Sequence, residues 1–191
     1  MTRALAALTL ALACAQGAAQ DAPAANGVLL VARPGMADPR FARTVVLVTQ
    51  AEGGQTLGVV LNRPTPARHE GRPLWYGGPV LERSVVALFA AEAPPAAAAF
   101  HVLRNVYLSM HPEIVAALLA EGRSRYRLYS GFAAWAPGQL ERELAESAWY
   151  VLPAEEPTLF RESMDGLWEE LVAKAQGARA GAGTIALQSI P

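Results

Sequence analysis

Apolar residues along this chain follow the spacing of strands more often than that of helices. A continuous apolar run at 27–32 predicts a strand buried on both faces. The β-branched runs at 44–49 and 57–62, with a glycine pair between them, predict a hairpin. Shorter runs predict further strands at 74–76, 84–90, 101–108, 126–130 and 148–152. The polar stretch between Pro64 and Pro73 is expected to be an exposed loop.

Helical spacing occurs in three places, at 112–121, from Gln139 to 148, and at 163–174. Pro112 suits the first position of the first of these helices, and Gly122 is a stop signal. Gly131 is expected to make a tight turn between the 126–130 strand and the second helix. Glycine and alanine dominate from residue 175, so residues 175–191 are predicted to form a flexible tail.

The balance of elements indicates the fold class. Strands outnumber helices and do not alternate regularly with them, which favours an α+β fold over a doubly wound parallel sheet. The patterned segment, residues 27–174, suits a single domain.

Composition narrows the classes of function. Hydrophobic residues make up 52% and charged residues 17%, as in globular and not disordered proteins. The formal net charge of −1 argues against a nucleic-acid partner bound through a strongly basic surface.

The first twenty residues resemble a secretory signal peptide. A single Arg3 precedes an apolar run from Ala4 to Ala13, and small residues follow. Cys14, the only cysteine, lies where a lipidated cysteine would, although Ala11 replaces the usual leucine of that signal. We therefore expect an exported domain, attached to a membrane only if Cys14 is lipidated. The alternative is translation starting nearer Asn26 and a cytoplasmic protein.

Catalytic and metal-binding patterns find little support. Ser130 lacks the first glycine of the G-x-S-x-G motif, and His69, His101 and His111 are scattered. Neither a second cysteine nor an H-x-x-x-H pair is present, so we expect no metal and no cofactor. Arg123, Arg125 and Arg127 alternate along one strand face, interpreted as a solvated face in preference to an anion-binding stripe.

Four ordered motifs resemble the YqgE/AlgH family of bacterial proteins, also called UPF0301 or DUF179. They are Leu29-Leu30-Val31-Ala32-Arg33-Pro34 leading through Phe41 to Arg43-Thr44-Val45-Val46, then Gly58-Val59-Val60-Leu61-Asn62-Arg63-Pro64, Gly77-Gly78-Pro79-Val80, and Gly131-Phe132-Ala133-Ala134-Trp135 with Pro137-Gly138-Gln139-Leu140-Glu141. The resemblance implies a bifurcated, bulged mixed sheet wrapped into a pseudo-barrel with packed helices. It also implies a regulatory role in some bacteria and no settled chemistry.

Polar and glycine positions inside these motifs define a candidate binding cleft: Asn62, Arg63, Gly77, Gly78, Gln139 and Glu141. Other motif positions are expected to be structural: Pro64, Pro79, Gly131, Trp135 and Gly138. Each choice has a plainer alternative, since Asn62 could bond the loop backbone and Gly77-Gly78 could make a tight turn instead of an anion-binding nest.

The leading hypothesis is a non-enzymatic domain that binds an unidentified small molecule or protein and serves regulation. The alternative is a hydrolase or phosphate-handling enzyme that uses the Gly77-Gly78 loop with Arg63 and Glu141. A transcriptional regulator is the third candidate, and export would exclude it.

Overall fold

The computed structural model describes residues 27–50, 55–122 and 125–187. The predicted signal peptide with Cys14, the turn of the first hairpin, and Arg123 lie outside these residues. The strands are β1 Val28–Ala32, β2 Val45–Gln50, β3 Thr56–Val60, β4 Pro64–His69, β5 Arg72–Tyr76, β6 Val80–Ala90, β7 Phe100–Leu103, β8 Val106–Ser109, β9 Tyr126–Trp135 and β10 Trp149–Pro153. The helices are α1 Pro112–Glu121, α2 Gln139–Ala145, α3 Glu156–Leu159 and α4 Leu167–Leu187.

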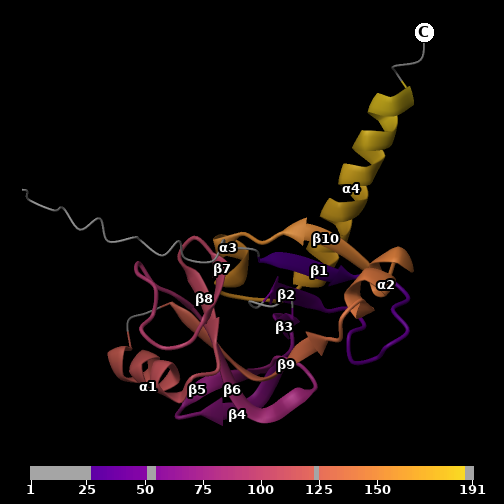
Figure 1. The fold of residues 1–191 in the computed structure, drawn as a ribbon. Coiled ribbons are helices and arrows are strands. Elements are labelled where there is room, and N and C mark those ends of the chain that lie inside the picture. The colour runs from indigo at the N-terminus through magenta and orange to yellow at the C-terminus, as the bar shows by residue number, and fades with distance from the viewer. Residues whose placement is uncertain (1–26, 51–54, 123–124, 188–191) are drawn as a thin grey trace, which may run out of the picture.

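One ten-stranded sheet with a branch organises the fold (Figure 1). Its main path runs β10-β1-β2-β3-β9-β6-β8-β7 through antiparallel pairs. The branch arises at β9, which also pairs in parallel with β5, and β5 in turn pairs with β4. The expected α+β class and the bifurcated sheet are confirmed, and the path of described strands does not close on itself.

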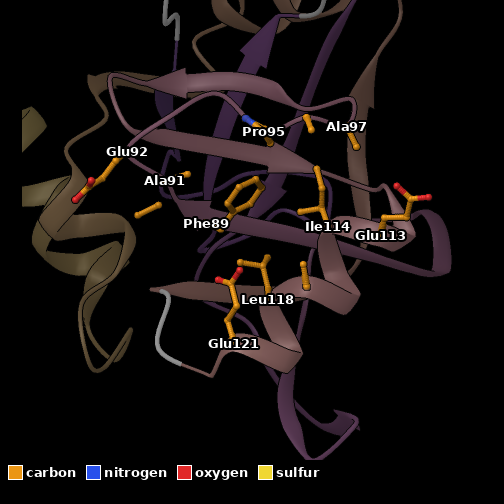
Figure 2. A pocket seen from close by; sticks show the side chains of 12 residues that line it. Phe89, Ala91, Glu92, Pro95, Ala97, Glu113, Ile114, Leu118 and Glu121 are labelled. Carbon is orange, nitrogen blue, oxygen red and sulfur yellow. The ribbon is translucent and has the colours of Figure 1, made fainter.

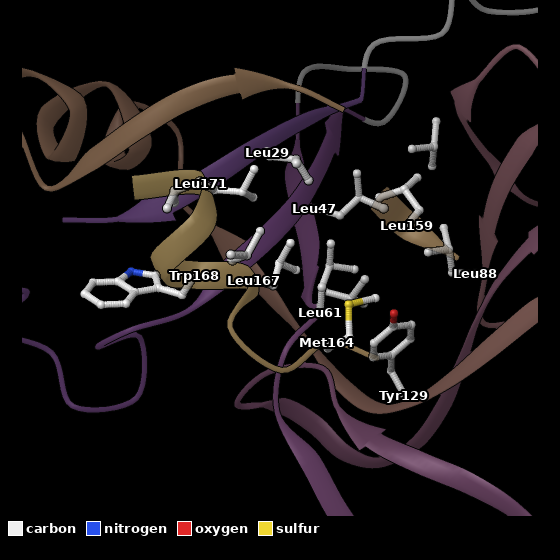
Figure 3. Close-up of a cluster of buried hydrophobic side chains, with 14 of the residues drawn as sticks. Leu29, Leu47, Leu61, Leu88, Tyr129, Leu159, Met164, Leu167, Trp168 and Leu171 are labelled. Carbon is white, nitrogen blue, oxygen red and sulfur yellow. The ribbon is translucent and has the colours of Figure 1, made fainter. Parts of the chain in front are cut away.

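Strands β1 to β3 are buried on both faces, which the unbroken apolar run of β1 predicts. One face packs on α3 and the start of α4 through a cluster that includes Leu29, Leu47, Leu167 and Trp168 (Figure 3). The Trp168 indole N–H donates to the backbone oxygen of Ala32 at 2.7 Å, which satisfies its polar atom inside the core. The other face packs on a second cluster with tryptophans of β9 and β10, beneath α2.

Gly131 does not make the predicted tight turn, because β9 continues through it to Trp135. Its φ of 68° places it in the left-handed region, and a Cβ there would lie 2.5 Å from the backbone oxygen of Gly78. Gly77 and Gly78 lie equally close to β9, because added Cβ atoms on them would lie 2.2 and 2.3 Å from its backbone atoms. The three glycines therefore permit close contact between two backbones next to the register shift between β6 and β9.

Several other element predictions need correction. The 64–73 stretch is a hairpin of β4 and β5, whose exposed, proline-containing edge strand looks like a loop in sequence. The single strand expected at 101–108 is the hairpin β7–β8, turning at Arg104 and Asn105. The last helix begins at Leu167 instead of residue 163, because Gly166 has a φ of 69°. It continues to Leu187, so residues 175–187 of the predicted tail belong to this helix, and residues 188–191 lie outside the described part of the chain.

The remaining predicted elements lie where they were expected, although α2 ends at Ala145 instead of residue 148. Helix α1 spans Pro112–Glu121 and ends at Gly122, which has the left-handed φ of 63° typical of a helix stop. Helix α2 begins at Gln139, and β2 pairs antiparallel with β3. Among the described residues no helix combines the length and apolar character needed to cross a membrane.

Candidate functional site

A pocket of about 680 Å³ lies where the loop after β1 meets the end of β9, helix α2 and the start of β10. Its lining consists of Arg33, Pro34, Gly35, Met36, Ala37, Asp38, Arg40, Phe41, Pro79, Val80, Ala134, Trp135, Gln139, Glu143, Glu146, Ser147, Ala148 and Trp149. Three of the four sequence motifs thus contribute to one concave surface of a size typical of small-molecule sites.

Three aromatic rings form the apolar wall of this pocket. The Phe41 ring stacks on Trp135 with centroids 6.4 Å apart and meets Trp149 edge-on at 5.8 Å. The two tryptophans meet each other edge-on at 6.5 Å. These separations lie in the range favoured by aromatic pairs, so the three rings support one another as a unit.

The Glu143 carboxylate holds the two indoles in place. Its Oε2 accepts the indole N–H of Trp135 at 3.0 Å and that of Trp149 at 2.8 Å. Its Oε1 accepts the side-chain amide of Gln139 at 2.9 Å, four residues earlier on the same helix face. The Gln139 oxygen in turn accepts the backbone N–H of Ala136 at 3.1 Å, which closes the start of α2.

The loop over the pocket carries its own ion pair. Asp38 accepts both the backbone N–H and the guanidinium of Arg40, with the closest side-chain contact at 2.7 Å. The hydrogen bond from the Arg40 side chain holds the pKa of the Asp38 carboxyl below its usual value. Arg33 lies over the Tyr150 ring at 4.6 Å and donates to the backbone oxygen of Ser147 at 3.3 Å.

Asn62 and Arg63 bond backbone groups at the end of this loop and just after it, and they do not line the pocket. Asn62 accepts the backbone N–H of Val45 at 2.9 Å and donates to the oxygen of Arg43 at 3.0 Å. The Arg63 guanidinium donates to three loop carbonyls, those of Pro39, Arg40 and Ala42. Both residues match the alternative in which motif polar groups bond the loop backbone.

The backbone N–H and oxygen of Gly77 are both hydrogen-bonded within the sheet, which argues against a role in an anion-binding nest. Its N–H donates to the Ser130 oxygen at 2.9 Å, and its oxygen accepts the N–H of Val60 at 2.8 Å. Gly77 and Gly78 allow the close approach to β9 described above. They do not form the tight turn considered as the plainer alternative.

The predicted cleft residues are therefore only partly brought together. Gln139 lines the pocket, whereas Glu141 is exposed on the outer face of α2. Among the positions expected to be structural, Pro79 and Trp135 line it, Gly138 precedes α2 with a φ of 73°, and Pro64 pairs with Trp75 at the β4 edge.

Neither Glu143 nor Trp149 was among the predicted site residues. One signal was present, because Glu143 follows Gln139 by four residues and so shares its helix face. The two tryptophan partners could not be inferred, since they depend on the path of β9, α2 and β10.

Ser130 and His101, the candidates considered for catalysis, each contact other groups. The Ser130 hydroxyl donates to the backbone oxygen of Glu82, and His101 stacks on Tyr107 in the β7–β8 hairpin, away from β9. No group of three or more His, Cys, Asp or Glu residues in the described ranges is placed to hold a metal ion.

A second pocket of about 640 Å³ lies between helix α1 and the connector after β6 (Figure 2). Phe89, Ile114 and Leu118 form its apolar wall, and carboxylates of Glu92, Glu113 and Glu121 stand around it. None of the four sequence motifs contributes to this pocket.

Known proteins resemble this chain in both sequence and structure. Residues 29–180 match the family model described as AlgH-like. A UPF0301 protein of Streptomyces avermitilis is 38% identical over 171 residues, covering 78% of this chain and 86% of that protein. A UPF0301 protein of Anaeromyxobacter dehalogenans is 35% identical over 179 residues, with coverages of 81% and 90%.

Two solved structures share the fold. The solution structure of the AlgH protein from Pseudomonas aeruginosa has a TM-score of 0.63 and 28% identity, covering 86% of this chain and 93% of that one. A crystal structure of a Corynebacterium diphtheriae protein has a TM-score of 0.63 and 27% identity, with coverages of 78% and 85%. The family match over most of the domain, with these relatives, shows that the chain belongs to the AlgH-like family of UPF0301 proteins.

Proposed function

We propose that this protein is a non-enzymatic binding domain whose pocket beneath the 33–41 loop takes a flat, largely apolar small molecule. The observation that carries the proposal is the wall of Phe41, Trp135 and Trp149, with both indoles held by Glu143. A rigid aromatic wall favours flat ligands, because rings stack on it without first ordering flexible side chains.

The polar groups around the pocket are largely engaged with one another. Both Glu143 oxygens are occupied, and Asp38 pairs with Arg40. The binding free energy of a ligand therefore comes mostly from apolar and ring contacts. Few hydrogen-bond donors are left without a protein partner, so few are available to orient a reacting group. This arrangement favours binding over catalysis.

A regulatory use would require the bound ligand to alter a surface. The loop over the pocket is suited to this, because Arg63 and Asn62 tie it to the sheet through backbone atoms. Ligand contacts with Phe41 can then shift the loop and so change the shape of its outer surface. The hydrolase or phosphate-handling alternative lacks such support, because Arg63 and Gly77 serve the backbone and Glu141 is exposed.

The test uses the four tryptophan indoles as reporters. Uniformly ¹⁵N-labelled protein is titrated with unlabelled indole while its own indole N–H signals are followed. We expect the signals of Trp135 and Trp149 to shift, and that of Trp168, which is bonded inside the core, to stay fixed. Equal shifts at all four tryptophans, or none, would count against the pocket.

A variant pair separates the pocket from general destabilisation. Phe41→Ala removes the ring between the two indoles and should weaken indole binding about tenfold, the ratio for about 1.4 kcal/mol of lost ring contact. Phe100→Ala removes a half-buried ring of another cluster and should leave indole affinity unchanged. Turnover in a broad hydrolase screen that Glu143→Gln abolishes would overturn the non-enzymatic assignment.

A further inference from the structure

A third cleft, of about 400 Å³, opens at the edge of the sheet where β5 pairs with β9. Four arginines line it: Arg72, Arg125, Arg127 and Arg161. The geometry points to this cleft as a binding site for a small phosphorylated molecule, separate from the aromatic pocket. No residue lines both.

The parallel pairing of β5 and β9 brings these arginines together from distant parts of the sequence. Leu74 pairs with Leu128, so Arg72, two residues earlier, lies beside the start of β9. Arg161 arrives from the segment between α3 and α4, and its backbone oxygen accepts a hydrogen bond from Arg127. Arg125 and Arg127, two of the three alternating arginines, line one side of the cleft, and Arg123 lies outside the described residues.

Arg127 is pre-organised for a ligand. Its guanidinium lies 4.9 Å above the Trp75 ring, and one of its amino groups is held by the Arg161 carbonyl. Of the described residues, none places a carboxylate within 4.0 Å of it, so its positive charge is not neutralised locally. A fixed, uncompensated guanidinium loses little entropy when an anion binds.

Arg72 provides a second uncompensated charge. Its guanidinium lies 5.9 Å from the Tyr126 ring, and in the described ranges it too has no ion-pair partner. The remaining two arginines are paired, Arg125 with Glu156 and Arg161 with Glu170 at 2.8 Å. The unpaired positive charge therefore comes from Arg72 and Arg127, and Glu162, which also lines the cleft, supplies one negative charge against these two.

The chemistry of the lining favours a phosphate ester over a simple carboxylate. Guanidinium groups present planar forks of donors that match phosphate oxygens, and several can share one phosphate. The rings of Trp75 and Phe160 lie beside the same arginines and can contact the organic part of an ester. The enclosed volume suits a small molecule, and the net charge of −1 does not favour a nucleic-acid chain.

The experiment titrates the full chain with inorganic pyrophosphate, with sodium chloride of equal ionic strength as the reference. We expect saturable binding by calorimetry and a shift of the Trp75 indole signal in ¹⁵N spectra, with Trp135 and Trp149 unaffected. Arg72→Gln and Arg127→Gln should each weaken binding roughly tenfold, as expected for loss of one charge-assisted contact. Arg83→Gln, at an exposed arginine outside the cleft, is the matched control and should bind normally.

Three results would overturn the proposal. The first is a pyrophosphate response no larger than that of sodium chloride, and the second is unchanged affinity in both arginine variants. The third is tighter binding of a single-stranded oligonucleotide than of pyrophosphate, with a steep salt dependence, which would assign the surface to nucleic acid. Trp135 and Trp149 signals at their wild-type positions verify that each variant is folded. If Arg127→Gln does not fold, the affinity of Arg72→Gln alone decides the outcome.

Discussion

The Glu143 carboxylate accepts the indole N–H of Trp149 at 2.8 Å, joining helix α2 to the first residue of β10. The same oxygen accepts the indole of Trp135 at the end of β9. One carboxylate therefore fixes the relative position of three consecutive elements around the candidate pocket. Hydrogen bonds to a charged acceptor are stronger than neutral ones, so this group should matter more than its partly buried position suggests.

Replacing Glu143 by Gln should destabilise the protein by about 1–2 kcal/mol, because the two indoles lose their charged acceptor and the new side-chain amide N–H₂ faces the Gln139 amide N–H₂. Chemical denaturation followed by tryptophan fluorescence measures the change. Glu141→Gln is the matched control on the exposed face of the same helix, and its effect should stay within about 0.5 kcal/mol. Equal effects of the two substitutions would show that the carboxylate bridge contributes nothing.

Gly131 and Gly71 both have left-handed backbones but differ in their surroundings. The φ of Gly71 is 77° with nothing within 4 Å of an added Cβ, whereas a Cβ on Gly131 would lie 2.5 Å from the Gly78 oxygen. Gly71→Ala should therefore cost about 1 kcal/mol of stability for the backbone conformation alone. Gly131→Ala should cost about 3 kcal/mol or more, because backbone must also move. Similar melting temperatures for the two variants would refute the contact.

The same glycines show what sequence patterns can and cannot establish. A glycine after an alternating strand signals positive φ, and Gly131 has it. The signal does not distinguish a glycine turn that ends a strand from a glycine inside a strand, because that depends on the close approach of Gly77 and Gly78. Elements with local signals, such as α1 between Pro112 and Gly122, were predicted closely.

The candidate site was predictable only where its residues share a local pattern. Gln139 lines the pocket, yet Asn62 and Arg63, equally polar motif positions, bond loop carbonyls and backbone amides. Polarity at a motif position does not say whether the group faces a ligand or the backbone. The sequence pattern does not show the role of Glu143, because its tryptophan partners lie on the strands before and after α2.

Arg63 should be needed for the rigidity of the pocket loop. Its planar fork bonds the carbonyls of Pro39, Arg40 and Ala42, and a lysine can replace only part of that set. Arg63→Lys should make the loop amides exchange with solvent about tenfold faster in hydrogen-exchange measurements, as expected for about 1.4 kcal/mol of lost bonding. Arg68→Lys is the control, because the Arg68 guanidinium donates to the Gly71 oxygen, outside the pocket loop. Unchanged loop exchange in Arg63→Lys would contradict this role.

The Asp38–Arg40 pair predicts a sign for the dependence of stability on pH. Because the pKa of Asp38 is lowered in the folded state, its charged form stabilises the fold above the unfolded value of 3.8. That contribution is lost as the pH falls from 3.8 through the lowered pKa. The wild type should thus be more stable than Asp38→Asn at pH 6, and the difference should shrink below pH 3.8. Urea denaturation at both pH values measures it, and a difference that grows on acidification would reverse the argument.

The Tyr129 hydroxyl lies fully buried without a hydrogen-bond partner among the described residues (Figure 3). Burial raises the pKa of its phenol well above the usual value, so the group stays neutral and its cost is that of a desolvated hydroxyl. Tyr129→Phe should therefore stabilise the protein by about 1 kcal/mol in urea denaturation. Tyr150→Phe is the matched control in the same cluster, because its hydroxyl accepts the Gln176 side-chain amide at 3.5 Å. Destabilisation by Tyr129→Phe would mean that the hydroxyl has a partner, such as a buried water, that rewards its burial.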